Sequence, residues 1–362
     1  MALTWGDDYP IHQTPEPIAY AGTDRNFYDR YFFNGYRMES GDETFFAVAF
    51  GVYPQLNIAD AAFCVVRNGV QVNLHASRWL NMERMDLKVG PVSIDVEQPL
   101  QRLRVRVEAP EQGIRADIVF DARSNPIEEP RFMRRLGARA FMGYTRLTQN
   151  GRWSGWIEVD GVRESVSGCL GTRDRSWGVR PVGARDPQEG APPAPFQFFW
   201  LWSPSNFEDG SLFFHSNDDA EGRPWNRRAV FAPDQGEADE VEACSATVAW
   251  AKGTRHARSA EVQVGEETFA FEPELTFFML GLGYGHPAWS HGLNQGPLKG
   301  EREDFRLAEM DVRQPQHLHI QALSKVTRRG PRGERVGRGV LEQLVLGPHG
   351  PSGFAGMLDW AA

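Results

Sequence analysis

The alternation of apolar and charged side chains along residues 102–121 constrains the fold more than any other feature of the sequence. Leucine or valine alternates with arginine or glutamate through 102–108, and a turn near 111–113 leads into a similar pattern through 115–121. A period of two residues places alternate side chains on opposite faces of a strand, and a charged second face is typical of antiparallel sheet rather than buried parallel sheet. The alternation therefore predicts antiparallel strands with one wet face.

Tight-turn dipeptides divide the chain into further hairpins. The second half repeats the order of hairpins seen in the first, and no long stretch carries the 3.6-residue period of an amphipathic helix. We therefore expect an all-β protein with few, short helices, built from two antiparallel β-barrels. The dipeptides that favour the positive φ angles of a hairpin turn are Asn68-Gly69, Asn150-Gly151 and Asp160-Gly161.

The length of 362 residues suits two domains, at roughly 100–200 residues per domain. Glycine and proline are concentrated around 183–195, a composition that sustains neither strand nor helix. We expect an N-terminal barrel over 1–182, a linker over 183–194 and a C-terminal barrel over 195–362. A closed barrel leaves an interior that can hold one lipophilic molecule.

Composition excludes several classes of function. A net charge of −9 argues against a nucleic-acid partner, which needs a concentrated basic surface. The three cysteines lie far apart, which favours neither a disulfide framework nor a zinc ribbon. No signal peptide and no apolar run of about 18 residues is visible, so we expect a cytoplasmic protein without integral membrane association. Because no nucleophile elbow, Walker loop or dinucleotide fingerprint is found, hydrolase, kinase and hydride-transfer functions lose their usual support.

The densest mixture of chemical groups lies at residues 171–181. Asp174 stands between Arg173 and Arg175, and Trp177 and Arg180 follow. We expect this stretch to be a loop at the end of a sheet that partly covers the open end of a barrel. There the pKa of Asp174 would depend on burial, which raises it, and on the neighbouring cations, which lower it. The alternative is a structural clamp between the two domains.

A second group of polar and aromatic side chains lies at residues 281–292. Four glycines and a proline make this stretch an irregular loop that carries Tyr284, His286, Trp289 and His291. Imidazoles titrate near neutral pH, so the two histidines are candidates for acid and base catalysis. As metal ligands they are weaker, because no helix holds them on one face.

Three further histidines need weighing. His317 and His319 would share one face of a strand and make half of a metal site, but an outward polar face is the stronger expectation. We therefore expect no metal site. His215 lies on the same strand face as Phe213 and can look into a cavity. The aromatic share of 12% suits cavity walls, whose π faces can stabilise a cation, although such residues also build ordinary cores.

At Asp174-Arg175-Ser176-Trp177-Gly178 the chain resembles the calycin-like tandem-lipocalin superfamily. That group includes carotenoid hydratases, merosterol cyclases, fungal Diels-Alderases and many bacterial proteins of unassigned activity, the branch whose motif matches most closely. The resemblance implies two tandem lipocalin-like barrels. It also implies protonation or cyclisation of isoprenoid alkenes by a carboxylic acid among aromatic walls, without a cofactor. Only Asp174 and Trp177 match the motif closely enough to take over its roles.

The combined prediction is a cofactor-independent hydratase, or a cyclase or isomerase, acting on a lipophilic terpenoid-, steroid- or carotenoid-like molecule. The runner-up is a non-catalytic carrier of such a metabolite, and a third possibility is metal-assisted chemistry through the histidines. Whether the protein forms a homodimer is left open. In the leading hypothesis Asp174 donates a proton, Arg175 and Arg180 orient the substrate, Trp177 and Tyr284 face the developing cation, His286 or His291 takes or relays a proton, and His215 and Trp289 contact the ligand.

Overall fold

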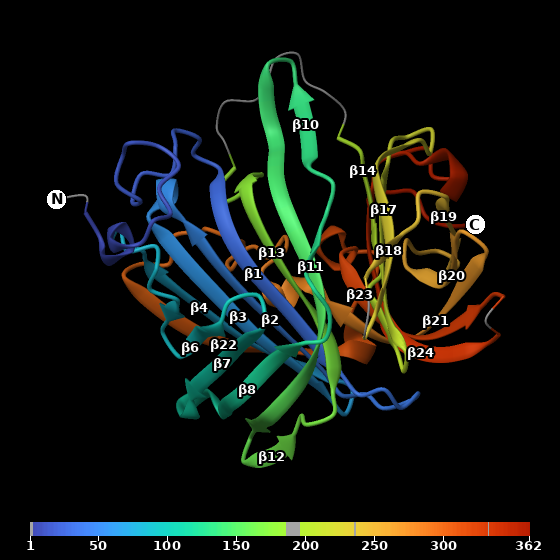
Figure 1. The fold of residues 1–362 in the computed structure, drawn as a ribbon, viewed down its shortest axis with the longest axis horizontal. Coiled ribbons are helices and arrows are strands. Elements are labelled where there is room, and N and C mark those ends of the chain that lie inside the picture. The colour runs from blue at the N-terminus through green and yellow to red at the C-terminus, as the bar shows by residue number, and fades with distance from the viewer. Residues whose placement is uncertain (1–2, 186–195, 235–236, 332) are drawn as a thin grey trace.

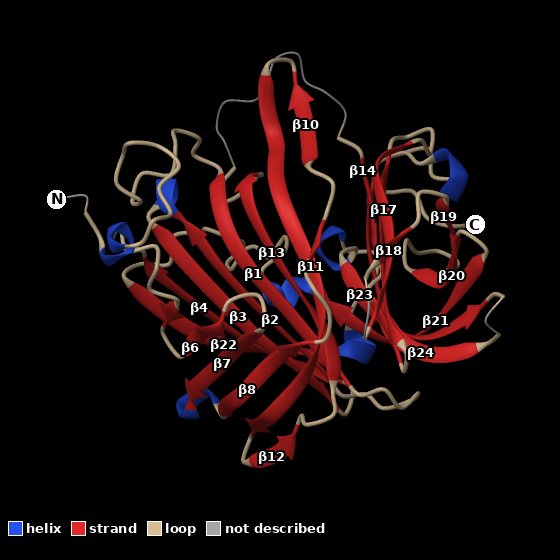
Figure 2. Ribbon diagram, viewed as in Figure 1, coloured by secondary structure: helices blue, strands red, loops and turns tan. Residues whose placement is uncertain are grey.

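The computed structural model describes residues 3–185, 196–234, 237–331 and 333–362. Within these ranges the protein is all-β, and its strands form two large antiparallel sheets (Figure 2). The helices of the described residues are single turns of 3-10 helix, as the absence of a 3.6-residue period predicts. They are η1 (Trp5–Asp8), η2 (Pro54–Leu56), η3 (Pro110–Gln112), η4 (Met279–Leu282), η5 (Leu307–Glu309), η6 (Pro315–His317) and η7 (Gly350–Ser352).

The first sheet curls into a nearly closed barrel. Its central strands run in the order β22-β4-β3-β2-β1-β13-β11-β8-β7-β6-β5, and three short strands pair with the long strand β11. The bounds are β1 (Phe27–Tyr36), β2 (Phe45–Tyr53), β3 (Ile58–Arg67), β4 (Val70–Trp79), β5 (Lys88–Val89), β6 (Val92–Gln98), β7 (Arg102–Ala109), β8 (Ile114–Ala122), β9 (Ile127–Glu128), β10 (Phe132–Leu136), β11 (Arg139–Val159), β12 (Val162–Ser165), β13 (Leu170–Val179) and β22 (Leu298–Arg306).

The second sheet lies beside the first and is built from the C-terminal half of the chain (Figure 1). Its strands run in the order β18-β17-β16-β14-β24-β23-β21-β20-β19, with β15 paired to β16 and β24. The two sheets confirm the predicted architecture of tandem antiparallel barrels. The bounds are β14 (Phe198–Trp202), β15 (Ser205–Phe207), β16 (Gly210–Asp218), β17 (Pro224–Pro233), β18 (Asp239–Glu240), β19 (Cys244–Trp250), β20 (Ala257–Val264), β21 (Glu267–Phe278), β23 (Ile320–Arg329) and β24 (Arg335–Leu346).

Two of the three predicted dipeptide turns form. Asn68 and Gly69 have φ angles of 49° and 74° and join β3 to β4, and Asp160-Gly161 joins β11 to β12 with positive φ at both residues. The prediction of a turn at Asn150-Gly151 is wrong, because β11 runs straight through it. The side-chain oxygen of Asn150 is buried and accepts a hydrogen bond from the hydroxyl of Thr172 at 2.7 Å, so the neighbouring strand β13 uses the residue that would otherwise favour a turn.

One strand departs from the expected division of the chain. β22 belongs by sequence to the second half, yet it pairs with β4 along its whole length and lies in the first sheet (Figure 1). The predicted linker at 183–194 falls largely on residues 186–195, which lie outside the described part of the chain. The two halves are therefore interlocked through β22.

Buried side chains form three layers. One cluster fills the interior of the first barrel, a second lies between the two sheets, and a third fills the concave side of the second sheet. Strand β2 shows how one strand serves two layers: Phe46, Val48 and Phe50 point into the first barrel, whereas Phe45 and Ala47 point toward the second sheet. Because both faces of β2 are covered, all nine of its residues are buried.

None of the described helices combines the length and the apolar character needed to cross a bilayer.

Candidate functional site

A cavity of about 820 Å³ lies in the layer between the two sheets, and residues of the β10–β11 hairpin form part of its lining. Figure 1 shows this hairpin projecting beyond the two sheets. The cavity walls come from β1, β11 and β13 of the first sheet, from β14 and β24 of the second, and from the loop after η4. This volume is typical of a site for a drug-sized ligand. The described cavity thus lies at the junction, whereas the expectation of a ligand inside a barrel meets an interior filled by side chains such as Phe120 and Trp153.

Asp174 reaches this cavity from a strand, not from a loop. Residues 170–179 form β13 between β1 and β11, which corrects the prediction of a loop at the end of a sheet. Because successive side chains of a strand point to opposite faces, Arg173 and Arg175 point away from Asp174. Arg173 donates from Nε to Oε1 of Gln149 at 2.8 Å, and Arg175 is paired with Asp29. The two adjacent arginines therefore do not hold Asp174 in its ionised form.

A different arginine pairs with Asp174. Nη2 of Arg146, on the neighbouring strand β11, donates to Oδ2 of Asp174 at 2.8 Å. Burial raises the pKa of Asp174 above its ordinary value, and the positive charges of Arg146 and Arg30 only partly offset that rise. The carboxyl group at the cavity wall is thus displaced toward its protonated form.

Arg146 serves a second buried carboxyl group, that of Glu129. Nε of Arg146 lies 3.4 Å from Oε1 of Glu129, and the hydroxyl of Thr148 also donates to that oxygen at 2.5 Å. Burial raises the pKa of Glu129 to about 7, and the charge of Asp174 adds to the rise. One guanidinium cannot neutralise two carboxylates, and a pKa of about 7 leaves this group partly protonated near neutral pH. The guanidinium carbon also lies 5.1 Å and 4.9 Å from the ring centroids of Trp200 and Trp202, which is within the range of a cation–π interaction.

A histidine and a carboxylate form a pair on the opposite wall. Nε2 of His319 donates to Oε1 of Glu342 at 2.8 Å, and both residues line the cavity. Glu342 also accepts from the indole of Trp200 at 2.8 Å and from Gln321 at 2.6 Å. Burial opposes ionisation of Glu342, but the hydrogen bond and charge of His319 outweigh it and lower the pKa. In the neutral form of the ring, this hydrogen bond from Nε2 leaves the lone pair on Nδ1, the arrangement of a positioned general base.

The loop after η4 contributes Tyr284 and His291 to the cavity, as the sequence predicts. His291 is neutral, since burial lowers its pKa well below the ordinary value. Its Nε2 donates to the carbonyl oxygen of Leu282 at 2.8 Å, and its Nδ1 accepts from Nη1 of Arg30 at 3.2 Å. Both nitrogens are occupied, so the geometry favours a role in positioning Arg30 over relay of a proton.

Of the other residues predicted for the site, Arg180 lines the cavity and five do not. Trp177 and Arg175 lie on the opposite face of β13 from Asp174, the face that points toward the first barrel. Trp177 is 37% exposed there, and Arg175 pairs with Asp29 and lies over the ring of Tyr31. His215 is buried behind the wall, with Nδ1 at 3.6 Å from Oε2 of Glu129. Burial lowers the pKa of His215 to about 3, so it is a neutral neighbour of Glu129. Trp289 packs beneath the loop, where it stacks on His75.

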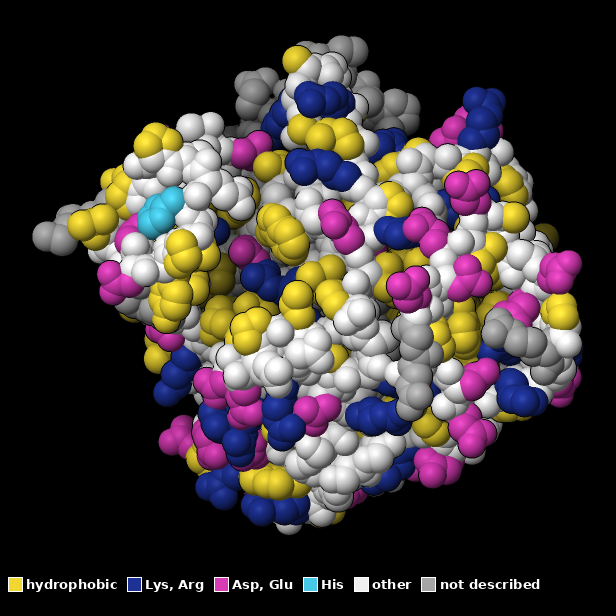
Figure 3. Space-filling model, viewed as in Figure 1, with side chains coloured by type: hydrophobic (Ala, Val, Ile, Leu, Met, Phe, Trp, Pro, Cys, Tyr) yellow, Lys and Arg dark blue, Asp and Glu magenta, His cyan; other side chains and the backbone are white. Residues whose placement is uncertain are grey.

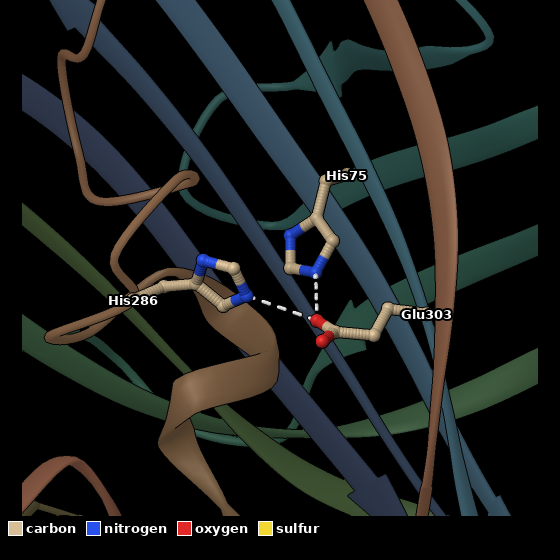
Figure 4. A group of neighbouring side chains, drawn as sticks. All are labelled: His75, His286 and Glu303. Carbon is tan, nitrogen blue, oxygen red and sulfur yellow. Dashed lines mark hydrogen bonds and ion pairs between the residues drawn. The ribbon is translucent and has the colours of Figure 1, made fainter.

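His286, the fifth of these residues, belongs to a separate cluster with His75 and Glu303 (Figure 4). Both imidazoles turn a nitrogen toward Oε2 of Glu303, at 2.9 Å from Nε2 of His286 and 3.7 Å from Nε2 of His75. The Nδ1 atom of His286 accepts the backbone N–H groups of Ala288 and Trp289 at 3.1 and 2.9 Å. Nε2 therefore carries the ring proton and donates it to Glu303, which is the wrong tautomer for a metal ligand.

His317 and His319 do not share a strand face, contrary to the expectation. His317 ends η6, where its Nδ1 lies 2.6 Å from the carbonyl oxygen of Asp311, whereas His319 is buried against Glu342. The prediction that the protein has no metal site stays a prediction.

Four residues of the site were missed from the sequence: Arg30, Glu129, Arg146 and Glu342. Each stands in an ordinary stretch without a motif around it, and the segments that carry them are distant in sequence. One signal was present. Glu342 is the one charged residue in the run 340–346, in which five of the other six residues are valine or leucine, and a buried charge needs partners.

Comparison with solved structures identifies the fold. A protein of Nitrosomonas europaea, provisionally named AttH, matches with a TM-score of 0.54 and 14% sequence identity, over 93% of this chain and 98% of its own. Kievitone hydratase from Nectria haematococca gives a TM-score of 0.48 at 12% identity, over 87% of this chain and 88% of its own. No curated protein matches the sequence. A family model matches residues 3–355, and the chain belongs to that family, a family of unknown function (DUF8625).

Proposed function

We propose that the protein is a cofactor-independent enzyme that transfers a proton to a lipophilic small molecule held between its two sheets, as a hydratase, isomerase or cyclase does. The observation that carries the proposal is the placement of Asp174. Its carboxyl group, whose pKa is raised by burial, faces a cavity with aromatic walls, and the His319–Glu342 pair faces the same cavity from the other sheet. An acid and a base on opposite walls suit the addition or removal of water across a double bond.

Asp174 is the proton donor in this mechanism. Protonated Asp174 gives its proton to one carbon of an alkene, and the positive charge develops on the other carbon. Trp200 and Tyr144 line the cavity, and an aromatic ring close to that charge would stabilise it. The carboxylate that remains keeps its hydrogen bond from Arg146, so no new contact has to form during the step.

His319 completes hydration. A water molecule attacks the cation and loses a proton to Nδ1 of His319, while Glu342 stabilises the imidazolium through Nε2. Where no water enters, loss of a neighbouring proton from the cation gives an isomer, and attack by a second double bond gives a ring. The base role thus belongs to His319 rather than to His286 or His291.

The proposal includes the finer assignment to the calycin-like tandem-lipocalin superfamily and the terpenoid, steroid or carotenoid class of substrate. The tandem-barrel architecture and the Asp174 motif support the superfamily. The apolar walls of the cavity, among them Phe32, Met142 and Met279, support the substrate class. A cytoplasmic location and a small-molecule partner belong to the same proposal.

Isotope incorporation tests the proposal across a panel of candidate substrates. The protein is incubated with unsaturated terpenoids and steroids in D2O enriched in 18O. The masses of the recovered compounds are then measured by mass spectrometry. We expect carbon-bound deuterium, with 18O as well if hydration occurs. In Asp174→Asn the rate of incorporation falls by roughly 10²–10⁴-fold, while binding of the same compound is retained.

The matched control is Asp117→Asn, which removes a carboxylate paired with Arg104 on the outer face of the first barrel and leaves the rate unchanged. Recovery of a bound but unlabelled ligand from the native protein would contradict catalysis and support the carrier hypothesis. A collapse of the melting temperature in Asp174→Asn would support the clamp.

A further inference from the structure

We infer that Arg30 and Arg180 form an oxyanion subsite in the cavity, so that the lipophilic ligand carries a carboxylate or another acidic oxygen group at one end. The inference rests on the ligand class proposed above and adds the head group to it. It concerns binding and does not depend on which reaction follows.

Arg30 is the more deeply buried of the two arginines. It projects from β1 into the cavity and is 1% exposed, yet its Nε and Nη2 atoms have no hydrogen-bond partner among the described residues. Its Nη1 donates to Nδ1 of neutral His291, an uncharged acceptor. A guanidinium has five N–H donors in a fixed plane, so most of the hydrogen-bonding capacity of Arg30 is unused.

Arg180 lies next to Arg30. The two guanidinium groups lie over the ring of Tyr284, with their Cζ atoms 4.5 Å and 5.8 Å from its centroid. Nη2 of Arg180 is also buried without a hydrogen-bond partner in the described part of the chain. Two cations with unused donors therefore lie around the same ring of the cavity wall.

The nearby carboxyl groups are committed to other partners. Asp174 accepts from Arg146, and Glu342 accepts from His319, Trp200 and Gln321. Asp60 accepts from the hydroxyl of Tyr53 at 3.0 Å and from the backbone of Gly292 at 2.7 Å. Within the described residues, none of these acids forms an ion pair with Arg30 or Arg180.

Buried cations without a counter-ion are costly, and they are retained where a ligand supplies the charge. A carboxylate offers two oxygens in a plane that matches the guanidinium donors, and phosphate offers a similar edge. The rest of the cavity is lined by apolar and aromatic side chains, which accommodate the hydrocarbon part of the same molecule. The subsite thus predicts an amphipathic ligand bound in one orientation.

The surface around the cavity also favours an anion. Arg134 and Arg135 line the cavity from the β10–β11 hairpin, and their neighbours Met133 and Leu136 are exposed. Figure 3 shows basic and hydrophobic side chains together on this projecting tip, on a protein whose net charge is −9. A local basic and apolar surface on an acidic protein attracts amphipathic anions to this point.

Occupation of the subsite would also act on the catalytic acid. The charges of Arg30 and Arg180 lower the pKa of Asp174. A bound anion neutralises those charges, so the ligand itself favours the protonated form of Asp174. Substrates with an acidic group would then be protonated faster than neutral analogues of the same length.

A matched set of probes tests the subsite: farnesoic acid, farnesol and farnesyl phosphate share one hydrocarbon chain and differ only in the head group. Binding is followed by the tryptophan fluorescence of the full chain, since Trp200 lines the cavity. We expect farnesoic acid or farnesyl phosphate to bind about tenfold or more tightly than farnesol, the range of a charged hydrogen bond. A tighter phosphate assigns the subsite to phosphate, and a tighter acid assigns it to carboxylate.

Arg30→Gln should lose about tenfold in affinity for the favoured anion and keep its affinity for farnesol within about threefold. Its melting temperature should equal or exceed that of the native protein, because an unpaired buried cation is removed. If Arg30→Gln does not fold, Arg180→Gln should show the same loss of affinity for the anion and the same retained affinity for farnesol. The control is Arg104→Gln, which changes the net charge equally on the outer face of the first barrel.

Equal affinities for the three probes would overturn the subsite while leaving acid catalysis by Asp174 untouched. Equal loss of anion and alcohol binding in Arg30→Gln would also overturn it, since the arginine would then be a structural support. Anion-selective binding without isotope incorporation would support the subsite and contradict the proposed reaction.

Discussion

Arg146 is the residue on which the electrostatics of the site depend. It is paired with Asp174 and Glu129, and its guanidinium carbon lies over the indole rings of Trp200 and Trp202. Because a single cation serves two buried carboxyl groups, the protonation of one affects the other. The acid at the cavity wall and the buried acid behind it therefore titrate as a pair.

The raised pKa of Glu129 predicts a specific dependence of stability on pH. The folded protein binds this proton up to a pKa of about 7, whereas the unfolded chain releases it near the ordinary glutamate pKa of 4.5. Between those values the folded state binds more protons, so the contribution of Glu129 to the free energy of unfolding is present at low pH and is lost as pH rises. Glu129→Gln keeps the neutral form and should gain on the order of 1–3 kcal/mol relative to the native protein between pH 5 and pH 8.

Urea unfolding at the two pH values measures this difference. Glu164→Gln, at an exposed position on β12, should show the same relative stability at both pH values. If the stability of Glu129→Gln relative to the native protein falls as the pH rises, the raised pKa of Glu129 is contradicted.

At the scale of the elements, β13 shows why a glycine is needed at position 171, three residues before Asp174. A Cβ atom on Gly171 would clash with the carbonyl oxygen of Asn34 and would lie 2.7 Å from Nε1 of Trp153. That indole donates to the same carbonyl oxygen at 2.9 Å, so neither group can move away freely. Gly171→Ala should lower the free energy of unfolding by roughly 1–3 kcal/mol.

Thermal and urea unfolding check this prediction. Gly300→Ala, in β22, is the matched control, because its nearest neighbour would be the carbonyl oxygen of His75 at an ordinary 3.7 Å. The control should change the free energy of unfolding by less than about 0.5 kcal/mol. Equal effects of the two substitutions would mean that β13 can move away from β1.

The elements were predictable where the signal is local. The alternation along β7 and β8 and the turns at Asn68-Gly69 and Asp160-Gly161 depend on adjacent residues, and the structure has them as expected. The prediction of a turn at Asn150-Gly151 was wrong because the interaction that keeps Asn150 in a strand is not local. Thr172, 22 positions further along the chain, donates a hydrogen bond to its side chain from β13. Asp174 was found through its motif, but its partner Arg146 and the Glu342 of the opposite wall come near it only in the folded chain.

At the scale of the whole molecule, the layer between the sheets joins the two halves. It contains buried side chains from both, such as Phe45 and Phe277, whose ring centroids lie 4.9 Å apart. Strand β22 adds a row of backbone hydrogen bonds to β4, and Gln71 on β4 exchanges two hydrogen bonds with the backbone of Phe278. Neither half can therefore lose its structure without exposing a large apolar face of the other.

We expect the full chain to unfold in one cooperative transition. Val105→Ala in the first barrel and Leu341→Ala in the second sheet should each shift that single transition, the second by roughly 2–5 kcal/mol. Circular dichroism in the far and near ultraviolet should report coincident curves for both variants. A second transition in either variant would show that the halves unfold independently.

Because the cavity lies between two sheets, substitutions that change ligand selectivity and substitutions that change reactivity can fall on different walls. Asp174, Arg146 and Arg30 belong to one wall, and Trp200, His319 and Glu342 belong to the other. A substitution on the second wall can reshape the space offered to a ligand while the acid keeps its strand partners. Selectivity and reactivity can consequently change at separate times in evolution, each on its own half of the chain.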